Sequence, residues 1–172
     1  MSSSTSLLPV NEIIQRISPA LAETILTYIQ QVEKEVFTST MIVMSEVMKY
    51  RPQIWKTWPK TRQREWLWTN LRQRRFAETA AQILQEWFFG QRAEMMNQFL
   101  DVLGISHDKE GSIDGDLPET LDAKKVNAAI DVLLKEFPGE EVALYLHLFQ
   151  RGQENGWKEI SEALASDSRL KF

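Results

Sequence analysis

The apolar residues of this chain recur at steps of three, four and seven, a spacing that places them along one side of an α-helix. The alternation typical of β-strands is nearly absent. Prolines, glycines and helix-capping residues separate the apolar segments. The pattern predicts an all-α protein, an irregular helical bundle of about six to seven helices, with two long N-terminal helices and a smaller C-terminal helical part.

The first long helix is predicted over residues 19–50, with Ser18 as its N-cap and Pro19 in its first turn. Arg51-Pro52 is its expected end, because proline disfavours helix in the residue before it. The β-branched cluster at 38–40 is its weakest part and the expected place of any division. One apolar stripe is expected to face the core, formed by Ile25, Ile29, Val32, Val36, Val43, Val47 and Tyr50.

The second long helix is predicted over 61–89, with a stripe that runs from Trp66 to Trp87, and Gly90 separates it from a helix over 91–103. Gly104 is a typical helix end. Shorter helices are expected over 121–137, 140–151 and 157–166. We therefore predict a flexible lead, 1–10, and a single helical domain, 11–172. Within this domain, an acidic loop over 105–120 joins a long-helix part, 11–104, to a short-helix part, 121–172.

The composition excludes several kinds of site. The chain of 172 residues has no cysteine and two histidines, so disulfides, thiolate nucleophiles and cysteine-bound zinc are excluded. Its first residues lack the basic region and apolar run of a secretory signal, and no apolar run approaches the ~18 residues that span a bilayer. We expect a cytoplasmic protein that has no cofactor and does not associate with membranes.

One segment differs from the rest in charge. Residues 49–75 hold nine lysines and arginines but one acidic residue, a charge of +8. The whole chain carries −4, so the other 145 residues carry −12. Four of the six tryptophans lie in the same segment. Any function that depends on charge is therefore expected to involve this segment.

Helical spacing predicts one exposed face in this segment. On a helix that starts near Thr61, Trp66 belongs to the core stripe, whereas Trp68 lies outside it, on a face shared with arginines three or four residues apart. The predicted partner-binding face consists of Lys56, Lys60, Arg64, Trp68, Arg72 and Arg75. An indole among guanidinium groups could anchor a protein partner, or bind the phosphates and stack the bases of a nucleic acid or another polyanion. The structural alternative is that the tryptophans fill the core and the arginine stems cover its edge.

The acidic loop has a partial likeness to a calcium-binding loop. Acidic residues and Ser112 follow the ligand spacing of a twelve-residue EF-hand frame, and the acidic members are Asp108, Glu110, Asp114, Asp116 and Glu119. The sixth position, where glycine makes a sharp turn, is Ile113 instead. A solvated acidic turn is the alternative interpretation.

No recognisable catalytic pattern occurs in the sequence. It has neither a glycine-rich phosphate loop nor a nucleophile elbow, and no Glu-x-x-His pair of a di-iron bundle. We predict a non-enzymatic helical protein-interaction module, and the long N-terminal helices favour self-association as a homodimer. Nucleic-acid or polyanion binding through the same face is the first alternative, and an enzyme with an unrecognised site is the second.

Overall fold

The computed structural model describes residues 7–51 and 53–172. Most of the predicted lead and Pro52, the predicted helix stop, lie outside the described residues. The described part is all-α: it contains nine α-helices and four short 3₁₀-helices. No strand forms in these residues, and a single β-bridge joins His107 to Ile113. The predicted fold class is confirmed, with more helices than the six or seven expected.

The described residues form two compact units. The first unit is 9–87, and the second comprises 88–172 together with residues 7 and 8. The boundary falls inside one helix, between Trp87 and Phe88. The loop over 105–120 therefore lies within the second unit.

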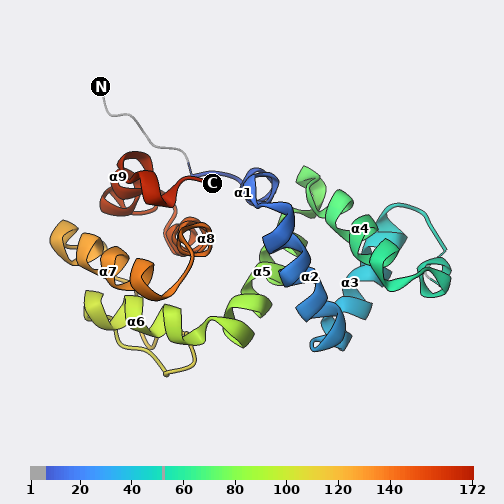
Figure 1. Ribbon diagram of the computed structural model, residues 1–172, viewed down its shortest axis with the longest axis horizontal. Coiled ribbons are helices and arrows are strands. Elements are labelled where there is room, and N and C mark those ends of the chain that lie inside the picture. Colours follow the sequence, from blue (N-terminus) through green and yellow to red (C-terminus); the bar gives the residue numbers. More distant parts are fainter. Residues whose placement is uncertain (1–6, 52) are drawn as a thin grey trace. The chain divides into compact units, whose positions relative to one another are not determined.

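The first unit is built on helix α2, which packs against α3 and α4 (Figure 1). Ser18 caps α2 as predicted, because its hydroxyl accepts a hydrogen bond from the Leu21 amide at 3.2 Å. The elements of this unit are α1 (Val10–Arg16), α2 (Pro19–Gln31), α3 (Lys34–Val47), the 3₁₀-helix η1 (Ile54–Thr57), α4 (Lys60–Leu71), the 3₁₀-helix η2 (Arg74–Phe76) and α5 (Ala77–Gln91), whose last residues belong to the second unit.

Both predicted long helices are divided in the structure, so this part of the prediction was wrong. The first ends at Gln31, with Val32 as its C-cap, and restarts after Glu33, whose φ of −92° and ψ of 56° are not helical. It continues unbroken through the weak cluster at 38–40. The second is interrupted at Gln73, whose φ of −80° and ψ of 140° are extended. Each interruption changes the direction of the residues that follow it, so stripes drawn across the break do not share a face.

The second unit is arranged around α8, which is buried at every position from Glu141 to Leu146. Helices α6 and α7 lie side by side in it (Figure 1). Gly104 ends α6 in the left-handed conformation, with φ 72°, as predicted. The elements are α6 (Ala93–Leu103), α7 (Ala123–Glu136), α8 (Gly139–Phe149), the 3₁₀-helix η3 (Gln150–Gly152), α9 (Lys158–Ser166) and the 3₁₀-helix η4 (Ser168–Leu170).

Candidate partner-binding surface

A buried pair of glutamines fixes the connector between α3 and α4. Gln63, on α4, donates hydrogen bonds to the carbonyl oxygens of Trp55 at 3.0 Å and Trp58 at 3.2 Å. Its own amide oxygen accepts from Gln30 of α2 at 3.0 Å, and Gln30 also donates to the Lys60 carbonyl. These bonds join α2 and α4 to backbone carbonyls of η1 and of the turn before α4, and the Trp55 carbonyl also accepts from the Trp58 amide at 3.0 Å. The tryptophans of the connector are therefore held in place.

Three half-exposed rings form an aromatic cluster beside this connector. We define the aromatic cluster as Tyr50, Trp58 and Trp66. The Trp66 ring meets Tyr50 and Trp58 edge to face, with centroids 6.2 and 5.9 Å apart. The Arg62 guanidinium lies over the Trp58 ring, 4.5 Å from its centroid. Trp66 is thus only half-buried, although the sequence pattern assigned it to the core. Trp55, in contrast, is buried against Phe37.

The outer face of α3 carries an apolar stripe that the first unit does not cover. We define the α3 stripe as Val36, Val43 and Val47 of α3 together with Tyr50, which lies just beyond the end of the helix. Val43 and Val47 are 49% and 50% exposed, Tyr50 is 46% exposed and Val36 is half-buried. Ile54, at the start of η1, is 43% exposed. The prediction of a core position was right for Ile25 and Ile29 but wrong for Val43, Val47 and Tyr50, and also for Val32, which is 61% exposed.

The reason is that α3 carries apolar residues in two helical phases. Its buried side is formed by Phe37, Thr40, Met41, Met44 and Ser45. Thr40 and Ser45 make this side look polar in the sequence, whereas the valines continue the phase of Ile25 and Ile29 in α2. The break at Glu33 removes that continuity. A single helix face cannot bury both sets, so the valines remain outside.

The predicted basic face is only partly assembled. The Arg64 guanidinium binds the Glu23 carboxylate at 2.6 and 2.9 Å and the Gln30 amide oxygen at 2.7 Å. The Arg64 side chain is 11% exposed, so it ties α4 to α2 and is not available to a partner. Trp68 is half-buried, so it is neither a core residue nor as exposed as predicted.

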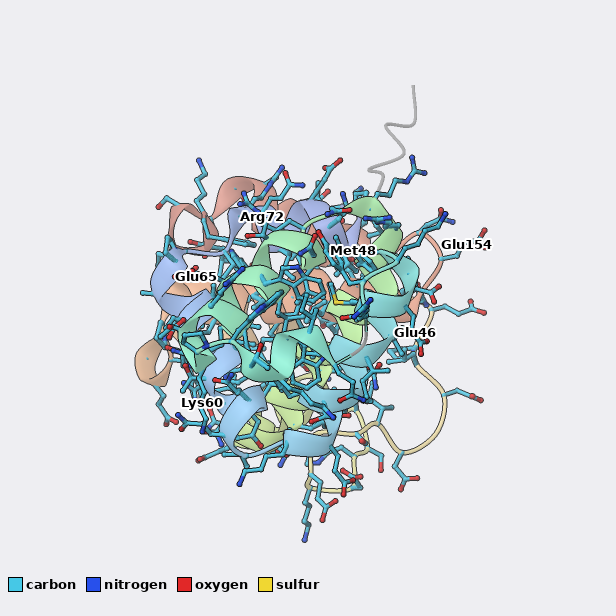
Figure 2. The ribbon with its side chains drawn as sticks, turned by 90° about the vertical axis from the view of Figure 1, so that its right-hand side faces the viewer. Glu46, Met48, Lys60, Glu65, Arg72 and Glu154 are labelled. Atoms are coloured by element: carbon cyan, nitrogen blue, oxygen red, sulfur yellow. The ribbon has the colours of Figure 1, made fainter. Side chains whose placement is uncertain are left out.

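The break at Gln73 separates the remaining members of that face. Arg75 lies beyond the break, where it bonds to the Gln73 side chain and covers the Phe76 ring. Arg72 and Lys60 are exposed at opposite ends of α4, separated by about 18 Å along the helix axis (Figure 2). Lys56 lies over the edge of the core at the Trp55 ring. The cations therefore surround the first unit instead of forming one face.

The acidic loop forms a small hairpin. Asp108 and Ser112 are joined by a backbone hydrogen bond, and Asp114 bonds back to the Ser106 carbonyl. The Asp108 carboxylate accepts from the amides of Glu110 and Ser112 at 2.8 and 3.1 Å, which closes the turn. Within residues 7–51 and 53–172, no group of three or more acidic or histidine side chains is placed to hold a metal ion. The calcium hypothesis gains no support from this geometry.

His107 contacts a carboxylate at the end of α6. Its Nε2 lies 2.6 Å from Asp101 Oδ1, at the end of α6, and its Nδ1 accepts a hydrogen bond from the Lys109 amide. The pair attaches the hairpin to α6. This role is structural and requires no ligand.

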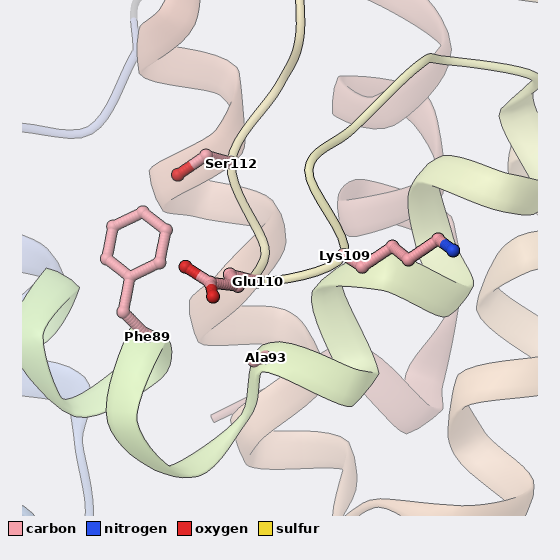
Figure 3. Close-up of a pocket in the computed structure, with 5 residues that line it drawn as sticks. All are labelled: Phe89, Ala93, Lys109, Glu110 and Ser112. Carbon is pink, nitrogen blue, oxygen red and sulfur yellow. The ribbon is translucent and has the colours of Figure 1, made fainter.

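An open pocket of about 440 Å³ lies between this hairpin and the junction of α5 with α6. Phe89, Ala93, Lys109, Glu110 and Ser112 line it. Figure 3 shows Glu110 and Ser112 on the side of Phe89, whereas Lys109 points away from them. Phe89, Lys109 and Glu110 are exposed, and the polar groups do not converge on one point. The pocket therefore lacks the enclosed, polar-focused form typical of an active site.

Comparisons with known proteins identify no relative: no protein-family model, curated protein or solved structure matches the chain. Across the described residues, none of the helices combines the length and the apolar character needed to cross a membrane. The candidate functional surface is that of the first unit, where the α3 stripe adjoins the aromatic cluster.

Proposed function

We propose that this chain is a helical protein-interaction module that binds its partner through the α3 stripe and the adjoining aromatic cluster. The observation that carries the proposal is the exposure of Val43 and Val47, one turn apart on α3, and of Tyr50 just beyond its end, each between 46% and 50% exposed; Ile54, at the start of η1, is 43% exposed. Exposed apolar residues that occur singly are ordinary, but a contiguous group is typical of a contact surface.

These exposed side chains contribute little to the stability of the isolated unit. Valine is a poorer helix former than alanine, lysine or glutamate, so it does not favour α3 at exposed positions. Full burial of a valine-sized side chain contributes about 1.5–3 kcal/mol, and each of these four has about half of that contribution still available. A partner that covers them would gain a few kcal/mol of apolar burial.

The aromatic cluster is suited to be the buried anchor of an interface, and the neighbouring cations are suited to its exposed rim. Tyrosine, tryptophan and arginine are the residues most often found at the centre of protein interfaces. Lys49 and Arg51, which flank Tyr50 in the chain, are exposed, and so are Glu35 and Glu46 on α3. Exposed charges of both signs beside an apolar surface contribute to the choice of partner.

A site-specific photo-cross-linker in place of Val47 tests the proposal in the full chain within its source cells. We expect a discrete protein adduct that disappears when Val43→Glu is added in the same chain. A cross-linker at Gln82, an exposed polar position on α5, is the matched control and should give no such adduct. Absence of the adduct at 47, or equal adducts at both positions, overturns the proposal. An adduct removed by nuclease indicates polyanion binding instead.

A further inference from the structure

The break at Gln73 brings exposed arginines to one end of the first unit. We define the arginine cluster as Arg16, Arg72, Arg74 and Arg75. The last three lie within four residues of the chain, so their Cα atoms are at most about 11 Å apart. Gln15, near the end of α1, donates a hydrogen bond to the Arg72 carbonyl at 3.2 Å, and α1 packs against η2. This contact places Arg16, the next residue, at the same end of the unit.

No carboxylate neutralises the arginine cluster within the part of the chain that the structure describes. Its members take part in none of the ion pairs there, whereas Arg64 and Arg92 each bind a glutamate. The nearest acidic residues in the chain, Glu12 and Glu78, are exposed and pair with none of the four. Arg75 is held by a neutral amide and an aromatic ring, which orient its guanidinium but leave the charge uncompensated.

Helix electrostatics explains only half of the arginine cluster. Arg16 and Arg72 lie at the C-terminal ends of α1 and α4, where positive charge is favourable. Arg74 and Arg75 lie directly before α5, at the start of a helix, where positive charge is unfavourable. The cluster therefore keeps like charges together without a full return in helix stability, and a bound anion would relieve their repulsion.

We infer that the arginine cluster binds the phosphates of a single-stranded nucleic acid. Guanidinium groups bind phosphate oxygens through paired hydrogen bonds, and several in a row can follow a phosphate backbone. Trp68 lies one turn before Arg72 on α4, is half-buried, and contacts no other ring or cation among the described residues. An unpaired base can stack on the exposed part of this indole. The bases of a duplex are already stacked and paired, which favours a single strand.

The charge of the chain is divided between the two units in a way that suits this ligand. Residues 9–87 hold eleven lysines and arginines and eight acidic residues, a charge of +3. Residues 88–172 hold nine and sixteen, a charge of −7. The first unit can therefore attract a polyanion although the whole chain is acidic. The arginine cluster shares no residue with the α3 stripe or the aromatic cluster, so binding here is independent of the proposed function.

Fluorescence anisotropy of a labelled thymidine oligomer of about twelve nucleotides, titrated with the full chain, tests the inference. The logarithm of the dissociation constant should rise with that of the salt concentration at a slope of about 2–3, the value for three or four phosphates. Arg72→Gln with Arg74→Gln should weaken binding about tenfold at low salt and lower the slope by about 1.4. Lys34→Gln with Lys60→Gln removes the same charge from exposed positions outside the cluster and should leave the slope unchanged.

Trp68→Leu separates base stacking from charge. It should weaken binding of the oligomer about tenfold without a change in the salt slope, whereas Trp68→Phe should retain part of the affinity because it keeps a ring. An abasic oligomer of the same length has the phosphates but no bases, so it should bind wild type and Trp68→Leu equally. A loss on Trp68→Leu that is as large with the abasic oligomer would contradict stacking on this ring.

The outcomes distinguish a nucleic acid from other anionic partners. Absence of binding at about 25 mM salt overturns the inference, as does an equal loss in the lysine control. Vesicles that contain phosphatidylserine should bind more weakly than the oligomer. Equally tight vesicle binding through the same arginines would indicate a membrane surface and overturn the assignment to a nucleic acid.

Val43→Glu should leave binding of the oligomer unchanged, so failure of the protein-interaction surface and failure of the arginine cluster appear in separate measurements. Circular dichroism and thermal unfolding of each variant check that the fold is retained.

Discussion

The side-chain amide of Gln30 donates a hydrogen bond to the amide oxygen of Gln63 at 3.0 Å, and both side chains are buried in the first unit. Through this pair, α2 and α4 are joined to the connector that carries Trp55 and Trp58. A buried amide that uses both its donors and its oxygen is well satisfied, and loss of Gln63 removes one hydrogen bond each from the Trp55 carbonyl, the Trp58 carbonyl and the Gln30 amide. The connector before α4 therefore depends on a polar contact inside an apolar core.

Gln63→Leu should lower the free energy of unfolding by about 2 kcal/mol. The substitution keeps the volume of the side chain but removes the hydrogen bonds to the carbonyls of Trp55 and Trp58 and the acceptor of Gln30, and each buried unpaired group costs about 1–3 kcal/mol. Urea unfolding followed by tryptophan fluorescence measures the change. Gln82→Leu, at an exposed position of α5, should stay within about 0.5 kcal/mol of wild type. Equal stability of the two variants would show that the network is not stabilising.

Helix existence could be predicted from the sequence more reliably than helix continuity. The Ser18 cap and the Gly104 end are local chemistry, visible in two or three residues, and both are confirmed. The breaks at Glu33 and Gln73 have no proline or glycine to mark them. They arise because each segment buries its own apolar side against the core, which is a tertiary effect that overrides local propensity.

The same tertiary effect explains why the sequence did not predict the candidate surface. A single stripe through α2 and α3 is the simplest interpretation of the valines when the helix is assumed to be continuous. Phe37, Met41 and Met44 form a second apolar face beside the valines. One helix face cannot bury both sets, so this excess of apolar residues was the sequence signal that one set is exposed. The pairing of Arg64 with Glu23 joins residues 41 positions apart, and no local pattern contains it.

Lys49→Gly should raise the free energy of unfolding by about 1 kcal/mol. Lys49 follows the end of α3 with φ 60°, and the Tyr50 amide returns to the Ser45 carbonyl at 2.8 Å, the arrangement in which helices usually place glycine. A residue with a Cβ is strained by about 1 kcal/mol in this left-handed conformation. Lys49→Ala keeps the Cβ and serves as the control. If the alanine variant is stabilised as much as the glycine variant, charge and not backbone strain explains the gain.

Arg92→Ala should destabilise the second unit by about 2 kcal/mol. Arg92 binds the Glu141 carboxylate through two nitrogens at 2.5 and 3.1 Å, and the Glu141 side chain is 9% exposed. Removal of one partner from a buried pair costs about 3–5 kcal/mol, and the partial exposure of Arg92 reduces this. Chemical unfolding measures the loss.

The double variant Arg92→Met with Glu141→Leu should recover most of that stability, because no uncompensated charge remains buried. Lys158→Ala is the matched control, since its pair with Glu162 spans 3.6 Å between exposed side chains and contributes less than about 1 kcal/mol. A loss on Lys158→Ala as large as on Arg92→Ala would show that burial does not determine the value of these pairs.

Tyr145 should make the fold sensitive to alkaline pH. Burial among Phe88, Phe99 and Phe149 raises the pKa of this phenol far above its usual value of 10.0. Below pH 10 the phenol is neutral in both states, so its contribution to stability is fully present. Above pH 10 the unfolded chain releases a proton that the folded chain retains, and stability falls by up to about 1.4 kcal/mol for each pH unit.

Tyr145→Phe has no proton to release, so its stability should decline less steeply between pH 9 and pH 11 than that of wild type. Urea unfolding across this range measures both slopes, and the comparison within each protein cancels any constant effect of the lost hydroxyl. Parallel slopes for the two proteins would mean that the phenol ionises in the folded state, which contradicts its burial in α8.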